Sequence, residues 1–207
     1  MNDDRARVLA ILRGEDAPPP LAGAVPRAPG AAPAATAPPE PTASRPALLL
    51  APMATLTHPA LRVLVAEFGG YDLLWSEMIS AEALINGTPY ESYYLDESPD
   101  PGRLVFQLVG YGEQRVVEAT RLLARSGAAG IDFNMGCAAP HIVRKGGGIA
   151  WMRDAGRAAR LVKRMRTEAG GKSLSVKLRL GRSDDPRELV RLANALEEAG
   201  VDFLTLH

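Results

Sequence analysis

Short apolar runs of strand length alternate with longer runs of helical spacing from residue 47 onward, and this alternation limits the possible folds most strongly. The apolar runs cover residues 48–53, 72–78, 104–109, 131–135, 174–180 and 203–207. The helical runs cover residues 58–68, 81–86, 114–126, 154–169 and 186–199. Strands that are apolar on both faces and alternate with helices are typical of parallel β-α units. The sequence therefore predicts an α/β fold.

Residues suited to binding or catalysis recur where these predicted strands end. They are Met53 and Thr55, Glu77, Gln107, Asn134 and Cys137, Lys177 and Arg179, and His207. In a (β/α)8 barrel the site is assembled from the carboxyl ends of many strands. An open dinucleotide-binding sheet would instead carry G-x-G-x-x-G in its first turn, whereas residues 52–59 read PMATLTHP. We therefore predict a TIM (β/α)8-type barrel.

The number of predicted strands sets how much of a barrel the chain can form. An eight-stranded barrel typically takes ~250 residues, and residues 47–207 hold six predicted strands. Either the protein continues beyond these residues or a partner closes the sheet. We expect a truncated chain whose barrel is incomplete, with about six β/α units.

The first 46 residues differ in composition from the rest and are expected to form a separate arm. Residues 3–13 could form a short helix, and residues 17–46 contain ten of the 17 prolines, with almost no large apolar side chains. Such composition is typical of an extended, disordered linker. The sequence thus divides into an arm at 1–46 and a folded domain at 47–207.

Composition excludes several classes of protein, but the balanced overall charge does not show whether charged residues cluster on the surface. Lys plus Arg and Asp plus Glu both number 24, so overall charge does not indicate a polyanionic partner. The single cysteine excludes an internal disulfide framework and suits a reducing compartment. No apolar run approaches the ~18 residues of a membrane span. We expect a cytoplasmic protein without a membrane segment or a metal site.

The segment at 132–148, DFNMGCAAPHIVRKGGG, has the composition of a ligand-binding turn. It holds the single cysteine, Cys137, a cationic pair, Arg144 and Lys145, and three successive glycines. Glycine-rich backbone leaves amide groups free and lets a flat or anionic ligand come close. The G-K-[ST] sequence of a phosphate-binding loop is absent, so a nucleotide triphosphate site is not indicated.

The predicted helix at 154–169 is strongly basic on one side. Arg153, Arg157, Arg160 and Arg164 follow one another at helical spacing. A local cationic stripe beside a site is compatible with docking a phosphate backbone. An ordinary solvated helix face explains the pattern equally well.

Seven sequence pieces, in order and at compatible spacing, resemble the amino-terminal part of the tRNA-dihydrouridine synthases. They are APMA at 51–54, SEMISAEAL at 76–84, FQLVG at 106–110, GIDFNMGC at 130–137, RKGGG at 144–148, VKLRLG at 176–181 and AGVDFLTLH at 199–207. The family commonly has proline directly after the cysteine, whereas Ala138 and Ala139 precede Pro140 here.

This resemblance implies an enzyme that binds FMN at the strand ends, uses NADPH as reductant and reduces a uracil of tRNA by hydride transfer to C6. Cys137 would be the general acid that protonates C5. The substrate side would include Asn134, Arg179, Glu77, Arg144 and Lys145, with the exact role of Glu77 open. The flavin cradle would consist of Pro52, Met53, Ala54, Gln107, Lys177 and His207.

The chemistry of a thiol suits this role, although other interpretations stay open. A thiol with a pKa of ~8.5 is protonated at neutral pH and can release its proton. A lone cysteine can also be a small buried hydrophobe. Two alternative functions are an FMN-dependent barrel that reduces a free pyrimidine, similar to dihydroorotate dehydrogenase, and an inactive fragment.

Overall fold

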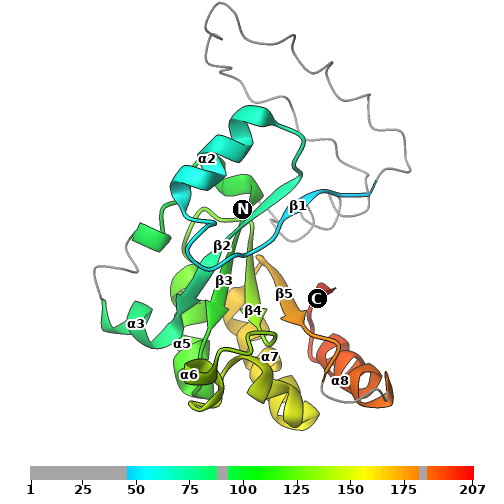
Figure 1. The fold of residues 1–207 in the computed structure, drawn as a ribbon. Coiled ribbons are helices and arrows are strands. Elements are labelled where there is room, and N and C mark those ends of the chain that lie inside the picture. Colours follow the sequence, from blue (N-terminus) through cyan, green and yellow to red (C-terminus); the bar gives the residue numbers. More distant parts are fainter. Residues whose placement is uncertain (1–45, 88–92, 182–185) are drawn as a thin grey trace, which may run out of the picture.

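The computed structural model describes residues 46–87, 93–181 and 186–207, which form a curled parallel sheet covered by helices (Figure 1). The strands are β1 (Leu49–Leu50), β2 (Leu73–Ser80), β3 (Leu104–Val109), β4 (Gly130–Asn134), β5 (Ser173–Leu178) and β6 (Phe203–Leu206). Each strand pairs in parallel with the next one along the chain, in the order β1-β2-β3-β4-β5-β6. Every crossover therefore steps in the same direction, as in a barrel.

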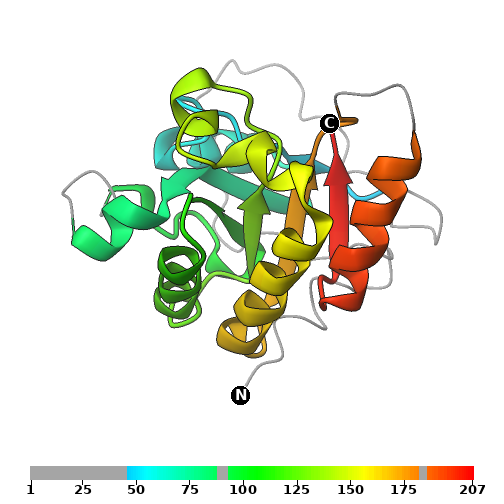
Figure 2. The same ribbon diagram turned by 90° about the horizontal axis from the view of Figure 1, so that it is seen from below.

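Helices follow the strands and cover one face of the sheet. The longer ones are α2 (Pro59–Phe68), α3 (Ala81–Asn86), α5 (Glu113–Leu123), α7 (Ala155–Ala169) and α8 (Pro186–Glu198). The short ones are η1 (Pro101–Arg103), α6 (Pro140–Val143) and η2 (Gly148–Arg153). Figure 2 shows α5, α7 and α8 next to one another along the same side of the sheet. The opposite, concave face is where a barrel interior would lie.

The sequence of α7 explains why a helix forms here and which side it buries. The Asp154 carboxylate accepts a hydrogen bond from the backbone N–H of Arg157 at 2.9 Å and so caps the first turn. The helix ends at Gly170, which has a φ of 58°. Its buried residues recur at helical spacing: Ala158, Leu161, Val162, Met165 and Ala169.

The strands divide their side chains between the helical layer and the concave face, because successive residues of a strand point to opposite faces. In β3, Phe106 joins the large core under the helices, whereas Val105 joins a second apolar cluster with Trp75 and Ala129. Gln107 lies two residues after Val105 and therefore on the concave face. The polar residues of the central strands thus gather on this face, above the second cluster.

The α/β class and the barrel-type curl of six units predicted from the sequence are confirmed. The predicted helix at 81–86 and the predicted strand at 104–109 match the structure at both ends. The first predicted strand, 48–53, is shortened to Leu49–Leu50 because the segment after it turns: the Thr57 side chain bonds both the N–H and the carbonyl of Met53. The predicted arm covers residues 1–46, of which all but residue 46 lie outside the described residues.

Within the described ranges, no helix has both the length and the apolarity needed to cross a lipid bilayer.

Candidate active site

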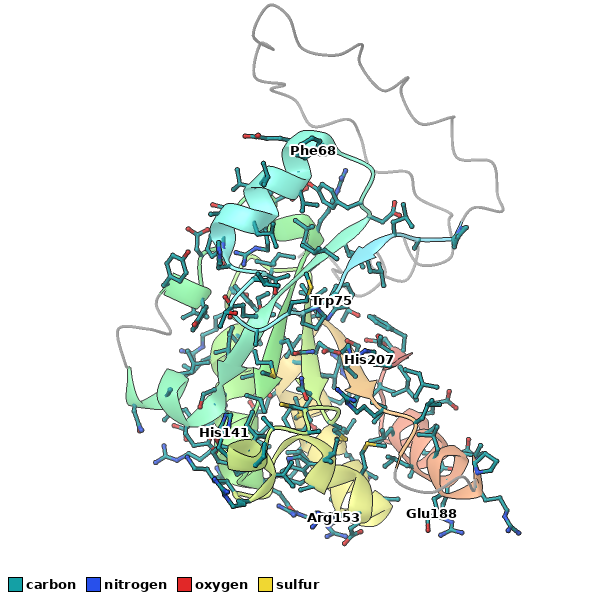
Figure 3. All side chains as sticks on the ribbon, viewed as in Figure 1. Phe68, Trp75, His141, Arg153, Glu188 and His207 are labelled. Atoms are coloured by element: carbon teal, nitrogen blue, oxygen red, sulfur yellow. The ribbon has the colours of Figure 1, made fainter. Side chains whose placement is uncertain are left out.

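The carboxyl ends of the strands bring most of the predicted site residues to one edge of the sheet. The register pairs Gln107 of β3 with Asp132 of β4 in one row. The next row toward the carboxyl edge pairs Asn134 of β4 with Lys177 of β5. Figure 3 shows His141 and Arg153 at the end of the molecule toward which the strands run, and Phe68 at the far end of α2. The site is therefore a strand-end site, as predicted.

A hydrogen-bonded chain of side chains connects β3, β4 and β5. The Gln107 amide donates to Asp132 Oδ2 at 2.6 Å, and Ser175 Oγ donates to Asp132 Oδ1 at 2.6 Å. Asn134 Nδ2 in turn donates to Gln107 Oε1 at 2.9 Å. Gln107 and Asp132 are fully buried, and Asn134 is 7% exposed. These groups thus form the polar floor of the site.

The turn from Asn134 to Cys137 is built by the Asn134 side chain. Its Oδ1 accepts the backbone N–H of Gly136 at 3.1 Å and that of Cys137 at 2.8 Å. Arg179 Nε donates to the Gly136 carbonyl at 2.6 Å and fixes the turn from the side of β5. The Cys137 thiol is free and half-buried, so it lies at the surface of the site on a restrained backbone.

Gly148, the last residue of the glycine run at 146–148, packs directly against the turn that carries Cys137. It has a φ of 55°, and a Cβ at this position would lie 2.1 Å from the Cys137 carbonyl oxygen. That carbonyl accepts the N–H of Ile149 at 3.0 Å. Glycine is therefore required so that the segment can pack directly against the backbone of the cysteine. Pro140 begins the short helix α6.

Two titratable groups on the concave face have shifted pKa values. Burial raises the pKa of Asp132 to about 6, opposed by hydrogen bonds from Gln107 and Ser175, by the Lys177 charge and by the Trp75 indole. Burial lowers the pKa of Lys177, opposed by Asp132 and reinforced by the neighbouring charge of Arg179. The half-buried Lys177 ammonium thus supplies positive charge in a partly desolvated place.

The turn after β1 contains three predicted flavin contacts, the half-buried Pro52 and the exposed Met53 and Ala54. Thr55, which follows them, has a φ of 64° and donates its N–H to Glu77 Oε2 at 2.5 Å. Glu77 is buried and so acts here as a backbone acceptor. This turn is therefore tied to β2 by a carboxylate.

Arg62 of α2 also supports the turn after β1, and its side chain is fully buried. Its guanidinium donates to the carbonyls of Thr57 at 2.9 Å, Ser98 at 3.0 Å and Asp96 at 2.5 Å. Burial lowers the pKa of Arg62, opposed chiefly by the charge of Asp96. One side chain thus joins the turn after β1 to the segment that precedes η1.

The remaining predicted residues lie at the rim. Arg144 and Lys145 are exposed at the end of α6, and the Lys145 ammonium lies 5.2 Å from the centroid of the Tyr111 ring. His207, directly after β6, is exposed and donates its backbone N–H to the Leu178 carbonyl at 3.0 Å. These three residues are therefore accessible but are not part of the hydrogen-bonded floor.

The basic stripe on α7 is only partly available to a partner. The Arg157 guanidinium stacks on Trp151, 3.9 Å from the ring centroid, and pairs with Glu113 at 3.6 Å. Arg164 also pairs with Glu113, at 3.7 Å. Arg153 and Arg160 are exposed. Half of the predicted cationic stripe is thus engaged within the protein.

The sequence interpretation did not identify Asp132, Ser175 and Arg62 as parts of the site. Asp132 and Ser175 could have been identified from the sequence. Each lies two residues before a predicted site residue, Asn134 and Lys177 respectively, and therefore on the same strand face. Nothing in the sequence distinguished Arg62 from a solvent-facing helix residue. Among the described residues, no group of three or more His, Cys, Asp or Glu side chains could hold a metal ion.

The sequence of this chain matches a known protein family. The family model for dihydrouridine synthase (Dus) matches residues 49–207. A probable tRNA-dihydrouridine synthase of Helicobacter pylori is 36% identical over 148 residues, which cover 70% of this chain and 44% of that protein. The tRNA-dihydrouridine synthase B of Xanthomonas axonopodis is 30% identical over 138 residues, 67% of this chain and 41% of that protein.

A third relative extends the comparison to cyanobacteria. The probable tRNA-dihydrouridine synthase 1 of Synechocystis is 32% identical over 146 residues, 70% of this chain and 41% of that protein. The chain thus spans less than half the length of these relatives. The matches do not favour the alternative of a free-pyrimidine reductase.

Proposed function

Because this chain belongs to the dihydrouridine synthase family, we propose that its protein reduces uridine to 5,6-dihydrouridine in tRNA. The observation that carries the proposal is the turn after β4, which holds a free, half-buried thiol at the carboxyl edge of the sheet beside Asn134. The ammonium of Lys177 lies on the neighbouring strand in the same row as Asn134. Members of this family depend on a flavin, and we propose FMN for this chain, with NADPH as the reductant.

The donor set at the strand ends fits a flat ring with a hydrogen-bonding edge. Met53 offers an exposed apolar surface next to Pro52 and Ala54, and Lys177 offers positive charge for an anionic ring. Gln107 lies one row deeper, where its amide nitrogen uses one of its two N–H groups on Asp132. His207 lies at the end of β6 and would close the cradle. When bound, FMN would supply the hydride that reaches C6 of uracil.

Cys137 would donate the proton to C5 of the uracil on the opposite face of the ring. Reduction of the 5,6 bond requires an acid within ~3 to 3.5 Å of the reacting carbon. Asn134 Oδ1 accepts the N–H groups of Gly136 and Cys137, and Arg179 Nε donates to the Gly136 carbonyl, so the backbone that carries the thiol is restrained. A protonated thiol at neutral pH is able to transfer its proton.

Asn134 and Arg179 would bind the pyrimidine and its ribose phosphate. Asn134 Nδ2 carries a second N–H beyond the one given to Gln107, which suits a uracil carbonyl. The terminal nitrogens of the exposed Arg179 extend beyond the Nε that bonds Gly136. Glu77 would act indirectly, because its carboxylate holds the backbone of Thr55.

The tRNA would approach the rim formed by α6. Arg144 and Lys145 are exposed there, and a local cationic group attracts a phosphate backbone even in a protein without net charge. The target nucleotide must leave its stack before its ring can reach the site. With tRNA as the substrate, we expect the reaction to take place in the cytoplasm.

The decisive test is Cys137→Ala in the complete protein. Reduction of the flavin by NADPH should continue at the unchanged rate, because the thiol takes no part in that step. Dihydrouridine formation in unmodified tRNA, measured by mass spectrometry, should fall by ~10²- to 10⁴-fold, the usual contribution of a general acid. Free uracil in place of tRNA serves as the control substrate and should not be reduced. Loss of both steps in the variant would mean that the assignment of Cys137 is wrong.

A further inference from the structure

A directional chain of hydrogen bonds joins a buried carboxylate to the backbone of the cysteine. It runs from Asp132 through the Gln107 and Asn134 amides to the N–H groups of Gly136 and Cys137, with donor–acceptor distances from 2.6 to 3.1 Å. Asp132 and Gln107 are fully buried, so water does not compete for these bonds. Two side-chain amides therefore connect the Asp132 carboxylate to the backbone of Gly136 and Cys137.

The direction of each bond follows from the groups at the two ends of the chain, the Asp132 carboxylate, which accepts, and the backbone N–H groups of Gly136 and Cys137, which donate. An ionised carboxylate accepts only, so Gln107 must present its NH2 to Asp132 and its carbonyl to Asn134. Asn134 must then present its NH2 to Gln107, which leaves its carbonyl for the turn. If the Asn134 amide were reversed, its NH2 would face two backbone N–H groups and both of those bonds would be lost.

We propose that Asp132 is a positioning residue, which fixes the direction of both amides and through them the turn that carries Cys137. The effect of Asp132 on the turn does not depend on the proposed function. Only the consequence for catalysis by Cys137 rests on it. The alternative is that Asp132 merely fills the floor of the site and satisfies Ser175.

The identity of the residue favours positioning over space filling. An asparagine at 132 has the same shape and could bond both Gln107 and Ser175 without placing a charge in the interior, which is costly. Asparagine can, however, be turned either way, so it does not dictate the direction of the Gln107 amide. The backbone N–H groups of Gly136 and Cys137 favour the observed direction from one end of the chain, and of the two side chains only a carboxylate at 132 imposes the same direction from the other end.

The test uses the rate of alkylation of the thiol by iodoacetamide. Cys137 is the single cysteine of the 207-residue chain, so the modification reports on one site without further mutation. The assay is run at about pH 8, above the pKa of about 6 to which burial raises Asp132, so that the carboxylate is ionised. In Asp132→Asn the direction of the chain is imposed from the turn end only, so we expect the turn to be held more weakly by about one net hydrogen bond and the rate to rise about fivefold.

A charge swap provides the rescue. In the double variant Asp132→Asn with Gln107→Glu, the carboxylate stands at 107 and must accept both from residue 132 and from Asn134 Nδ2. The Asn134 carbonyl then faces the turn again, so alkylation should return to the wild-type rate. Ser175→Ala is the matched control, because it removes the other partner of Asp132 without changing the direction of the chain. It should lower the melting temperature and leave the alkylation rate unchanged.

Each result decides the matter. A wild-type rate in Asp132→Asn overturns the proposal, and so does a double variant that is alkylated as fast as the single one. If Asp132→Asn does not fold, the double variant alone decides: folding with a wild-type rate supports positioning, and failure to fold or a faster rate overturns it. None of these outcomes depends on flavin or tRNA, so the proposed function can fail or succeed separately.

Discussion

The turns after β1 and β4 lie at the same edge of the sheet, yet they are held in different ways. The turn after β4 depends on the side-chain amide of Asn134 and on Gly148, whose φ of 55° brings it against the Cys137 backbone. The turn after β1 has Thr55, a β-branched residue, at a φ of 64° and holds it with the Glu77 carboxylate. One turn thus uses a residue suited to its conformation, and the other imposes the conformation by a contact from β2.

A buried charge supports each turn, but the two charges differ in reach and in response to pH. Asp132 acts within neighbouring strands, whereas Arg62 binds carbonyls up to 36 residues away in the chain. A guanidinium stays charged at all ordinary pH values, while a carboxylate can be protonated. The support that Asp132 gives to the turn carrying the thiol should therefore respond to mild acid, whereas the support that Arg62 gives to the turn after β1 should not.

The largest effect is expected from Gly148→Ala. The added Cβ would meet the Cys137 carbonyl at 2.1 Å in a backbone conformation that L-residues rarely adopt. We expect a loss of at least about 4 kcal/mol of unfolding free energy, measured by denaturant titration. Gly146→Ala is the control, since its φ is 90° but no atom lies within 4 Å of its Cβ, and it should cost about 1 kcal/mol. Equal losses in the two variants would contradict the importance of the close approach.

Arg62→Leu should be the most damaging change to the other turn. It leaves the carbonyls of Thr57, Ser98 and Asp96 without their guanidinium partner, at a cost of roughly 3 to 4 kcal/mol in unfolding free energy. The alkylation rate of Cys137 in the folded protein should not change, because the two turns are supported separately. Arg115→Leu on the exposed side of α5 is the matched control and should be nearly neutral. A changed thiol rate in Arg62→Leu would show that the turns are coupled.

The helices and strands were predictable because their residues obey simple periods. In β3 and β4 every position is buried, so a mainly apolar run marks each strand although it contains Gln107, Asp132 and Asn134, and the parallel arrangement brings all carboxyl ends to one edge. That single rule places Gln107, Asn134 and Lys177 together although they are distant in sequence. The predicted positions of the strand-end residues therefore follow from the fold class alone.

The supporting contacts were not predictable, because they join periodic elements to irregular ones. Arg62 lies in a helix where an arginine is usually exposed, and its partners at 96 and 98 lie outside any helix or strand. Arg157 was interpreted as part of a solvated or RNA-binding stripe, yet it stacks on Trp151 of η2. Such contacts depend on three-dimensional packing that neither spacing nor composition encodes.

The pH dependence of stability should separate the two buried charges. Burial raises the pKa of Asp132 from the ordinary 3.8 to about 6, so between these values the folded state binds this proton more tightly than the unfolded state. The contribution of this group to stability is therefore full below about pH 4 and is lost as the pH rises through about 6. Each unit of pKa difference corresponds to about 1.4 kcal/mol, which gives a loss of about 3 kcal/mol.

The measurement compares wild type with Asp132→Asn by denaturant titration from about pH 4 to pH 7. Other carboxylates, such as Asp96 with its lowered pKa, titrate in both proteins and cancel in the difference. The difference in unfolding free energy should shift in favour of the variant as the pH rises. Parallel curves would show that Asp132 does not titrate in this range.

The smallest expected effect, and the only gain, is that of Thr55→Gly. Among the described residues Thr55 is the one non-glycine with a positive φ, and glycine relieves that strain while keeping the backbone N–H that bonds Glu77. Glycine also adds freedom to the unfolded chain, so the net gain should be only about 1 kcal/mol, seen as a higher melting temperature. Ala54→Gly, one residue earlier and without a positive φ, should be destabilising by about 0.5 to 1 kcal/mol. If both variants lowered the melting temperature equally, the hydrogen bond to Glu77 would not be holding a strained turn, and the contrast between the two turns would disappear.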